Sequence, residues 1–126
     1  RGINQLRKQC WAVAGVDRSV PGMREVLAAT LRAMPRLEQE EALSLMNSQR
    51  TDQQFLLEEP SRRDLNLLLD LNHRQRTSAL LLEACLFRKE SRGGHFRSDA
   101  PMALPHWQCH SRQQKGRMIH TRPVSP

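Results

Sequence analysis

The sequence predicts an all-α fold: a three-helix bundle, spectrin-repeat-like, with an extended and irregular C-terminal tail. Helix-favouring Leu, Ala, Arg, Gln and Glu dominate the composition, Tyr is absent, and β-branched residues form no alternating runs. Apolar residues recur at three- and four-residue steps in three separate segments. A chain of 126 residues is long enough for one domain with one core.

The first helix is expected from about Ile3 to Ala14. Polar residues such as Arg7 and Lys8 turn outward, and Gly15 ends the helix. The buried face is expected to consist of apolar residues at helical spacing, namely Ile3, Leu6, Cys10 and Val13.

A second helix is expected over residues 20–46, with a kink at Pro35. Ser19 precedes Pro21, a combination typical of an N-cap followed by a proline in the first turn. Pro35 removes one helical hydrogen bond, so residues 36–46 form either a kinked continuation or a separate short helix, and we favour the continuation. Residues 47–60 are expected to form a connector with little structure of its own.

The third helix is expected over residues 61–92. Ser61 and Asp64 form a variant of the capping box at its start. Its apolar residues cover more than one face, which is typical of a central helix with neighbours on several sides. Gly93 and Gly94 are expected to end it, so residues 1–94 would form the bundle.

Residues 95–126 are expected to form an extended, basic docking tail. Proline recurs and the helical periodicity disappears. Residues 88–126 contain eight Lys or Arg residues and two acidic residues, so this third of the chain holds +6 of the net charge of +7. Apolar residues are spaced along the tail, which suggests that it lies across another surface.

Several features suggest a soluble, cytoplasmic fragment of a longer chain. The sequence opens at Arg1 with no initiating Met and no apolar leader. No apolar run approaches the roughly 20 residues that span a bilayer, so no membrane contact is expected. The odd number of cysteines, three at wide spacing, fits reduced thiols better than disulfides.

The most specific motif follows the third predicted helix. Its fixed positions are Glu90, Ser91, Arg92, Gly93, His95, Arg97, Asp99 and Pro101, with Gly94 and Phe96 at variable ones. This run resembles the Glu-Ser-Arg-Gly-(Ala/Gly)-His-x-Arg-x-Asp-x-Pro signature in the C-terminal domain of the flavoprotein family of aspartate oxidases, succinate dehydrogenases and fumarate reductases.

Two other segments are similar to the same family, more loosely. Residues 5–19 are similar to its opening helix, a Met-Trp segment that leads to Gly-Val-x-Arg, with Cys10 in place of the Met and Arg18 as the Arg. Trp107 and His110 look like the Trp-x-x-His near its C-terminus, and Asn72 fits an Asn in its central helix.

The resemblance implies the C-terminal helical domain of an FAD-dependent L-aspartate oxidase, which oxidises L-aspartate to iminoaspartate in de novo NAD biosynthesis. The short tail after Trp107 favours this subfamily over its alternative, a succinate dehydrogenase or fumarate reductase flavoprotein subunit. FAD would be bound by a separate Rossmann-like domain. This chain is expected to bind no cofactor and no metal, to hold no catalytic residue, and to brace the FAD-binding and capping domains of its parent.

The resemblance also implies that the motif forms a docking corner between domains. Its residues are Glu90, Ser91, Arg92, Gly93, Gly94, His95, Phe96, Arg97 and Asp99, together with Trp107 and His110. Arg92 and Arg97 are expected to form ion pairs within the chain or to lie in water, in preference to contacting a substrate.

Three other functions compete poorly. His106, Cys109 and His110 lack the paired second half that makes a zinc motif specific. Cys109 beside His110 lacks the geometry of a nucleophile and its general base. A basic helical module for nucleic-acid or protein interaction would explain the charge, but it leaves the motif unexplained and offers few aromatic residues for base stacking, so nucleic acid is an unlikely partner.

Overall fold

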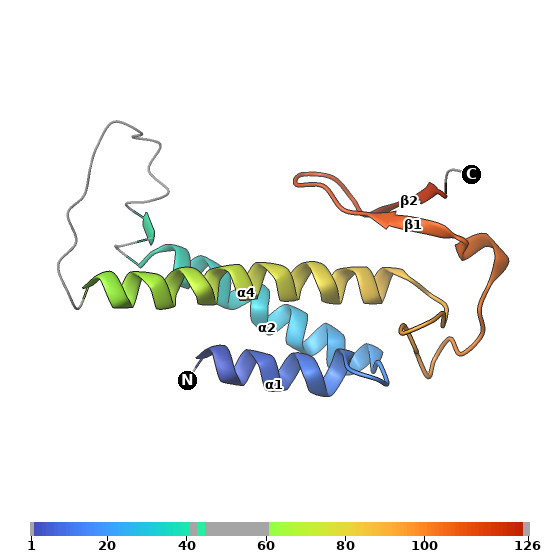
Figure 1. Cartoon of the computed structure of the whole chain (residues 1–126), viewed down its shortest axis with the longest axis horizontal. Coiled ribbons are helices and arrows are strands. Elements are labelled where there is room, and N and C mark those ends of the chain that lie inside the picture. Colours follow the sequence, from blue (N-terminus) through green and yellow to red (C-terminus); the bar gives the residue numbers. More distant parts are fainter. Residues whose placement is uncertain (1, 41–42, 45–60, 125–126) are drawn as a thin grey trace.

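The computed structural model describes residues 2–40, 43–44 and 61–124. In chain order the elements are α1 (Gly2–Ala14), α2 (Val20–Glu38), α4 (Ser61–Phe87), a 3-10 helix (Pro105–Trp107), β1 (Cys109–Arg112) and β2 (His120–Pro123). The three helices pack against one another in pairs. The prediction of a helical fold with three helices is therefore confirmed (Figure 1).

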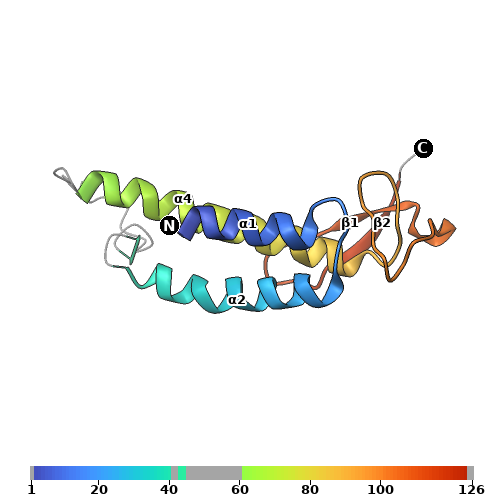
Figure 2. The same cartoon turned by 90° about the horizontal axis from the view of Figure 1, so that it is seen from below.

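The helices run along one another, and the strands lie at the end of the bundle where α4 finishes (Figure 2). The main cluster of buried side chains lies at that same end. Met23 and Leu82 are fully buried and form a cluster with Cys85. Partly buried residues pack around it, namely Cys10, Val13, Ala14, Val20, Val26, Leu27 and Leu86. This cluster joins the end of α1, the start of α2 and the last turns of α4.

The predicted start of α2 is confirmed. The Ser19 side chain accepts a hydrogen bond of 3.4 Å from the backbone N–H of Gly22, and Pro21 lies in the first turn. The hydroxyl thus satisfies one of the N–H groups that have no partner within the helix.

The predicted continuation of this helix to residue 46 is wrong. Pro35 lies inside α2, but the helix ends at Glu38, one turn later, where Gln39 N–H donates to the Pro35 carbonyl at 3.2 Å. Leu43 belongs to a separate helical turn, and its side chain is buried. The ring of Pro35 removes one donor from the last turn, which weakens the helix there. The predicted connector over residues 47–60 lies outside the described residues.

The predicted end of the third helix is also wrong. α4 ends at Phe87, five residues earlier than expected. Gly93 has a φ of +55°, but it belongs to a tight turn in which Arg92 and His95 exchange backbone hydrogen bonds of 2.8 and 3.0 Å. Gly93 has the left-handed conformation typical of a glycine that caps a helix, but it serves this turn and does not cap α4.

The tail is more ordered than the sequence predicts. β1 and β2 form an antiparallel hairpin in which His110 lies opposite Arg122 and Arg112 lies opposite His120. The strands escaped prediction because they lack the alternation of apolar and polar residues that identifies a half-buried strand. Within the described residues, no helix is both long and apolar enough to cross a membrane.

Candidate functional site

The motif folds into a corner beyond the end of α4, and we call residues 88–104 the corner. Its first feature is a buried carboxylate, since Glu90 has no exposed surface. A buried charge needs partners to replace the water that it loses. Glu90 receives them from two guanidinium groups and from one backbone amide.

The contacts around Glu90 are short. Arg88 donates to Oε1 from Nε at 2.9 Å and from Nη2 at 2.6 Å. Arg92 donates from Nε to Oε1 at 3.0 Å and from Nη2 to Oε2 at 3.2 Å. Leu104 N–H donates to Oε2 at 2.8 Å. We call Arg88, Glu90, Arg92 and the Leu104 amide the Glu90 cluster.

These contacts decide what Glu90 can do. The hydrogen bonds from Arg92, the Leu104 amide and Arg88 lower the pKa of Glu90 to about 2, although burial acts in the opposite direction. The same pairing with Glu90 raises the pKa of Arg92. A general acid or base works best with a pKa near the working pH. The contacts in the Glu90 cluster therefore favour a carboxylate that stays ionised, with a pKa well below that working range.

Arg97 forms a second cluster, which completes the end of α4. The last carbonyl groups of a helix have no partner within the helix. Nη1 of Arg97 donates to the carbonyls of Cys85 at 3.1 Å, Leu86 at 3.0 Å and Arg88 at 3.0 Å. On the other side of the guanidinium, Nε donates to Oδ1 of Asp99 at 2.9 Å and Nη2 donates to Oδ2 at 2.6 Å.

The Arg97 guanidinium thus bridges the negative end of α4 and a carboxylate, and only 3% of Arg97 is exposed. The hydrogen bonds from Arg97 lower the pKa of Asp99. Ser91 supports the same turn, because its hydroxyl accepts from Arg97 N–H at 2.9 Å and donates to the Ala100 carbonyl at 2.8 Å. The prediction that Arg92 and Arg97 form ion pairs within the chain is confirmed.

His95 lies among three arginines. Its Nε2 is 3.1 Å from the Arg88 carbonyl, which can only accept, so Nε2 carries the proton. Burial lowers the pKa of His95, and the charges of Arg18, Arg97 and Arg88 act in the same direction, while the hydrogen bond to the Arg88 carbonyl opposes them. The lowered pKa favours the neutral imidazole, which donates a hydrogen bond from Nε2 to the Arg88 carbonyl.

Sequence reasoning left two arginines out of the site. Arg88 lies two residues before Glu90, just outside the motif, and was not among the predicted site residues. Arg18, in the loop between α1 and α2, donates from Nη1 to the Gly94 carbonyl at 2.6 Å, and its backbone N–H donates to Phe96. Arg18 is the Arg of the Gly-Val-x-Arg pattern, so the structure brings two separate parts of the family resemblance together.

Trp107 joins this site, whereas His110 does not. The Trp107 ring packs edge-on against Phe87 at a centroid distance of 5.4 Å, and the Arg88 guanidinium lies 5.6 Å from its centroid. Arg88 also donates to the carbonyls of Trp107 at 2.5 Å and Cys109 at 3.1 Å. His110 is an exposed residue of β1.

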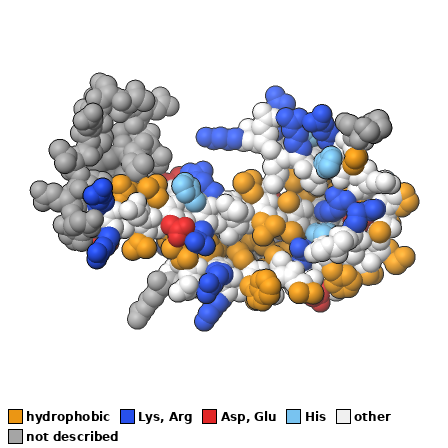
Figure 3. All heavy atoms as spheres, in the orientation of Figure 1, with side chains coloured by type: hydrophobic (Ala, Val, Ile, Leu, Met, Phe, Trp, Pro, Cys, Tyr) orange, Lys and Arg blue, Asp and Glu red, His pale blue; other side chains and the backbone are white. Residues whose placement is uncertain are grey.

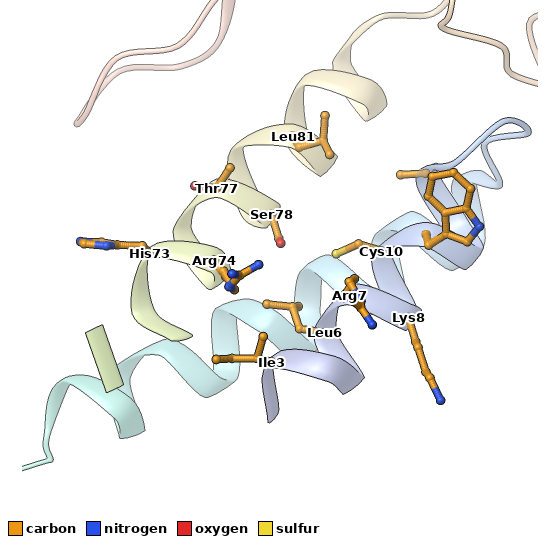
Figure 4. Close-up of a pocket in the computed structure, with 12 residues that line it drawn as sticks. Ile3, Leu6, Arg7, Lys8, Cys10, His73, Arg74, Thr77, Ser78 and Leu81 are labelled. Carbon is orange, nitrogen blue, oxygen red and sulfur yellow. The ribbon is translucent and has the colours of Figure 1, made fainter. Parts of the chain in front are cut away.

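An open groove between α1 and α4 is a second candidate surface. Its volume is about 830 Å³, and Figure 4 shows that its side chains come from both helices. Trp11 and Leu81 contribute exposed apolar surface, with 74% and 47% of each residue exposed. Arg7, Lys8 and Arg74 also line the groove.

Neither surface has the features of a cofactor site. Among the described residues no group of three His, Cys, Asp or Glu residues could hold a metal ion. The two strands in the described residues are antiparallel, and neither leads through a glycine-rich turn into a helix. This arrangement does not fit FAD, whose pyrophosphate is held by such a strand-turn-helix unit.

Comparisons with known proteins give a consistent result. A family model described as the fumarate reductase flavoprotein C-terminus matches residues 3–125. An L-aspartate oxidase of Synechocystis sp. is 28% identical over 109 residues, which cover 86% of this chain and 20% of that protein. An L-aspartate oxidase of Nostoc sp. is 58% identical over 36 residues, which cover 29% of this chain and 6% of that protein.

The chain thus spans about a fifth of the length of the Synechocystis relative. No solved structure matches it. Since the family match covers nearly the whole sequence, the chain belongs to the family of fumarate reductase flavoprotein C-terminal domains.

Proposed function

We propose that this chain is the C-terminal helical domain of an FAD-dependent L-aspartate oxidase, which converts L-aspartate to iminoaspartate in de novo NAD biosynthesis. The observation that carries the proposal is the similarity to an L-aspartate oxidase over 86% of the chain. Its three free cysteines agree with a reducing compartment, so we place the enzyme in the cytoplasm.

The role we propose for the domain is to brace its parent enzyme. The charged groups of the motif are committed to contacts within the chain, Glu90 with two arginines and Arg97 with Asp99. They are therefore poor candidates for catalysis. FAD and the substrate would be held by the FAD-binding and capping domains of the parent chain.

The groove between α1 and α4 is the surface that we expect those domains to cover. Trp11 is the feature that supports this, because a large aromatic residue with 74% exposure leaves apolar surface in water. Aromatic anchors often supply much of the binding energy at protein interfaces. Arg7 and Lys8, beside it, could pair with carboxylates at the rim of such an interface.

The test is to mix this chain with the separately expressed FAD-containing portion of its parent. We expect the mixture to retain more flavin and to produce peroxide in the presence of L-aspartate. Trp11→Ser should reduce association, whereas Leu67→Ser, at a 60% exposed position of α4 outside the groove, should not. Failure of the unaltered chain to associate, or activity with succinate in place of L-aspartate, would contradict the proposal.

A further inference from the structure

One face of the β1–β2 hairpin consists of four basic side chains. In an antiparallel pair, residues directly opposite share a face, and so do residues two apart on one strand. His110 lies opposite Arg122 and Arg112 lies opposite His120, so these four residues share a face. We call them the basic face of the hairpin.

The basic face points away from the helices. Along β1 the side chains of Cys109 and Ser111 are partly buried, whereas those of His110 and Arg112 are exposed. Gln113, one step further, donates to Glu83 of α4 at 3.2 Å, which places that side of the hairpin toward the bundle. The space-filling view shows Lys and Arg side chains gathered over the hairpin (Figure 3).

The basic face has no acidic counterpart in the described part of the chain. None of its four side chains takes part in an ion pair there. The arginines of the corner, by contrast, are paired with Glu90 and Asp99. An unpaired cluster of this kind is suited to an external anionic partner.

We propose that the basic face is a docking surface for an acidic polypeptide segment that presents neighbouring carboxylates. Its dimensions favour this partner over nucleic acid. Residues two apart on a strand are separated by about 7 Å and the strands by about 5 Å, so the face is a compact patch. Proteins that track a nucleic-acid backbone use longer basic grooves with aromatic residues for base stacking. The basic face has no aromatic residue other than His.

Arg112 and Arg122 are the residues that would pair with the carboxylates. A guanidinium can donate two parallel hydrogen bonds to one carboxylate, as Arg97 does to Asp99 in this chain. Arg112 and Arg122 lie at diagonal positions of the face, so they could hold two carboxylates at once. This inference concerns a surface separate from the groove and does not depend on the enzyme activity of the parent.

The experiment is to titrate the full chain with fluorescein-labelled hexaglutamate and to follow fluorescence anisotropy at low salt. We expect the double substitution Arg112→Gln with Arg122→Gln to weaken binding at least about tenfold. The matched control, Lys115→Gln with Arg117→Gln, removes the same charge from the turn and should change binding less than about twofold. Amide chemical shifts during the titration should move mainly at the four residues of the basic face.

Three results would overturn the inference. Equal weakening by both double substitutions would mean that only net charge matters. Tighter binding of a duplex oligonucleotide at the same salt concentration would point to nucleic acid instead. An absence of hexaglutamate binding, with backbone amide shifts showing an intact hairpin, would remove the docking surface altogether.

Discussion

Arg18 Nη1 donates a 2.6 Å hydrogen bond to the Gly94 carbonyl across 76 positions of the sequence. The backbone repeats this connection, because Arg18 N–H donates to the Phe96 carbonyl at 3.1 Å and Arg18 forms a parallel bridge with Arg97. The loop between α1 and α2 and the corner after α4 are therefore one structural unit.

Replacing Arg18 tests this connection. We expect Arg18→Met to lower the free energy of unfolding by about 1 kcal/mol, because the side-chain hydrogen bond to Gly94 is lost while the backbone bond to Phe96 remains. The loss stays modest because Nε of Arg18 is buried without a partner, so the substitution also removes an unsatisfied donor. Urea unfolding measures the effect. Arg32→Met, on the exposed side of α2, is the control, and identical midpoints for both variants would contradict the prediction.

Arg97 should be irreplaceable even by another cation. One guanidinium contacts three carbonyls at the end of α4 and both oxygens of Asp99, whereas a lysine ammonium has three donors and no planar fork. We expect Arg97→Lys to cost about 3 kcal/mol, since several charged hydrogen bonds are lost at a buried position.

Hydrogen exchange locates the effect of Arg97→Lys. The amide protons in the last turn of α4 should exchange faster in the variant than in the wild-type chain. In the middle of α4, the exchange rates should change only as much as the loss of global stability requires. Lys89→Arg, at an exposed position next to the helix end, is the control for a change of cation. Uniform acceleration along α4 would show that Arg97 does not act on the helix end.

The sequence was sufficient to predict the helices because their signals are local. The apolar spacing in α1 and the cap formed by Ser19 depend on neighbouring residues only. The end of α4 was missed because it depends on Arg97, which lies ten residues beyond Phe87. The Arg97 guanidinium donates hydrogen bonds to carbonyls in the last turn of the helix. Helix propensities describe neighbouring residues only, so they could not predict this contact.

In the corner, too, local features could be predicted and contacts between distant residues could not. The motif predicted the run from Glu90 to Asp99 but not the parts played by Arg88 and Arg18, and the ion pairs of Arg92 and Arg97 followed from their charge. The contact of Arg18 with Gly94 could not be derived from spacing, because the chain returns to that point only after all three helices have packed. The hairpin was missed because its exposed face is basic where a half-buried strand would alternate with apolar residues.

Gly93 and Gly94 should respond differently to the same substitution. Gly93 has a φ of +55°, which a residue with a Cβ adopts at a cost, whereas Gly94 has no such conformation. A Cβ at either position would meet no atom within 4 Å, so steric contact does not distinguish them. We expect Gly93→Ala to cost about 1 kcal/mol and Gly94→Ala to cost less than half of that. Equal unfolding midpoints for the two variants would contradict the assignment of the turn.

The Glu90 cluster should make stability depend on pH. The folded-state pKa of Glu90 is about 2, below the ordinary value of 4.5, so its contribution is complete above 4.5 and is lost as the pH falls toward 2. Glu90→Gln lacks this contribution at every pH and leaves Arg88 and Arg92 without their carboxylate. The wild-type chain should therefore be clearly more stable than the variant near neutral pH, and the difference should narrow in acid.

Urea unfolding at about pH 7, 4 and 3 measures this difference. Asp99, whose pKa is also lowered, is present in both chains, so its effect cancels in the comparison. Glu25→Gln, which removes an exposed carboxylate from α2, is the control and should follow the wild-type chain at each pH. If the difference between wild type and Glu90→Gln stayed constant from neutral pH into acid, the carboxylate would not be ionised against its two arginines in the folded state.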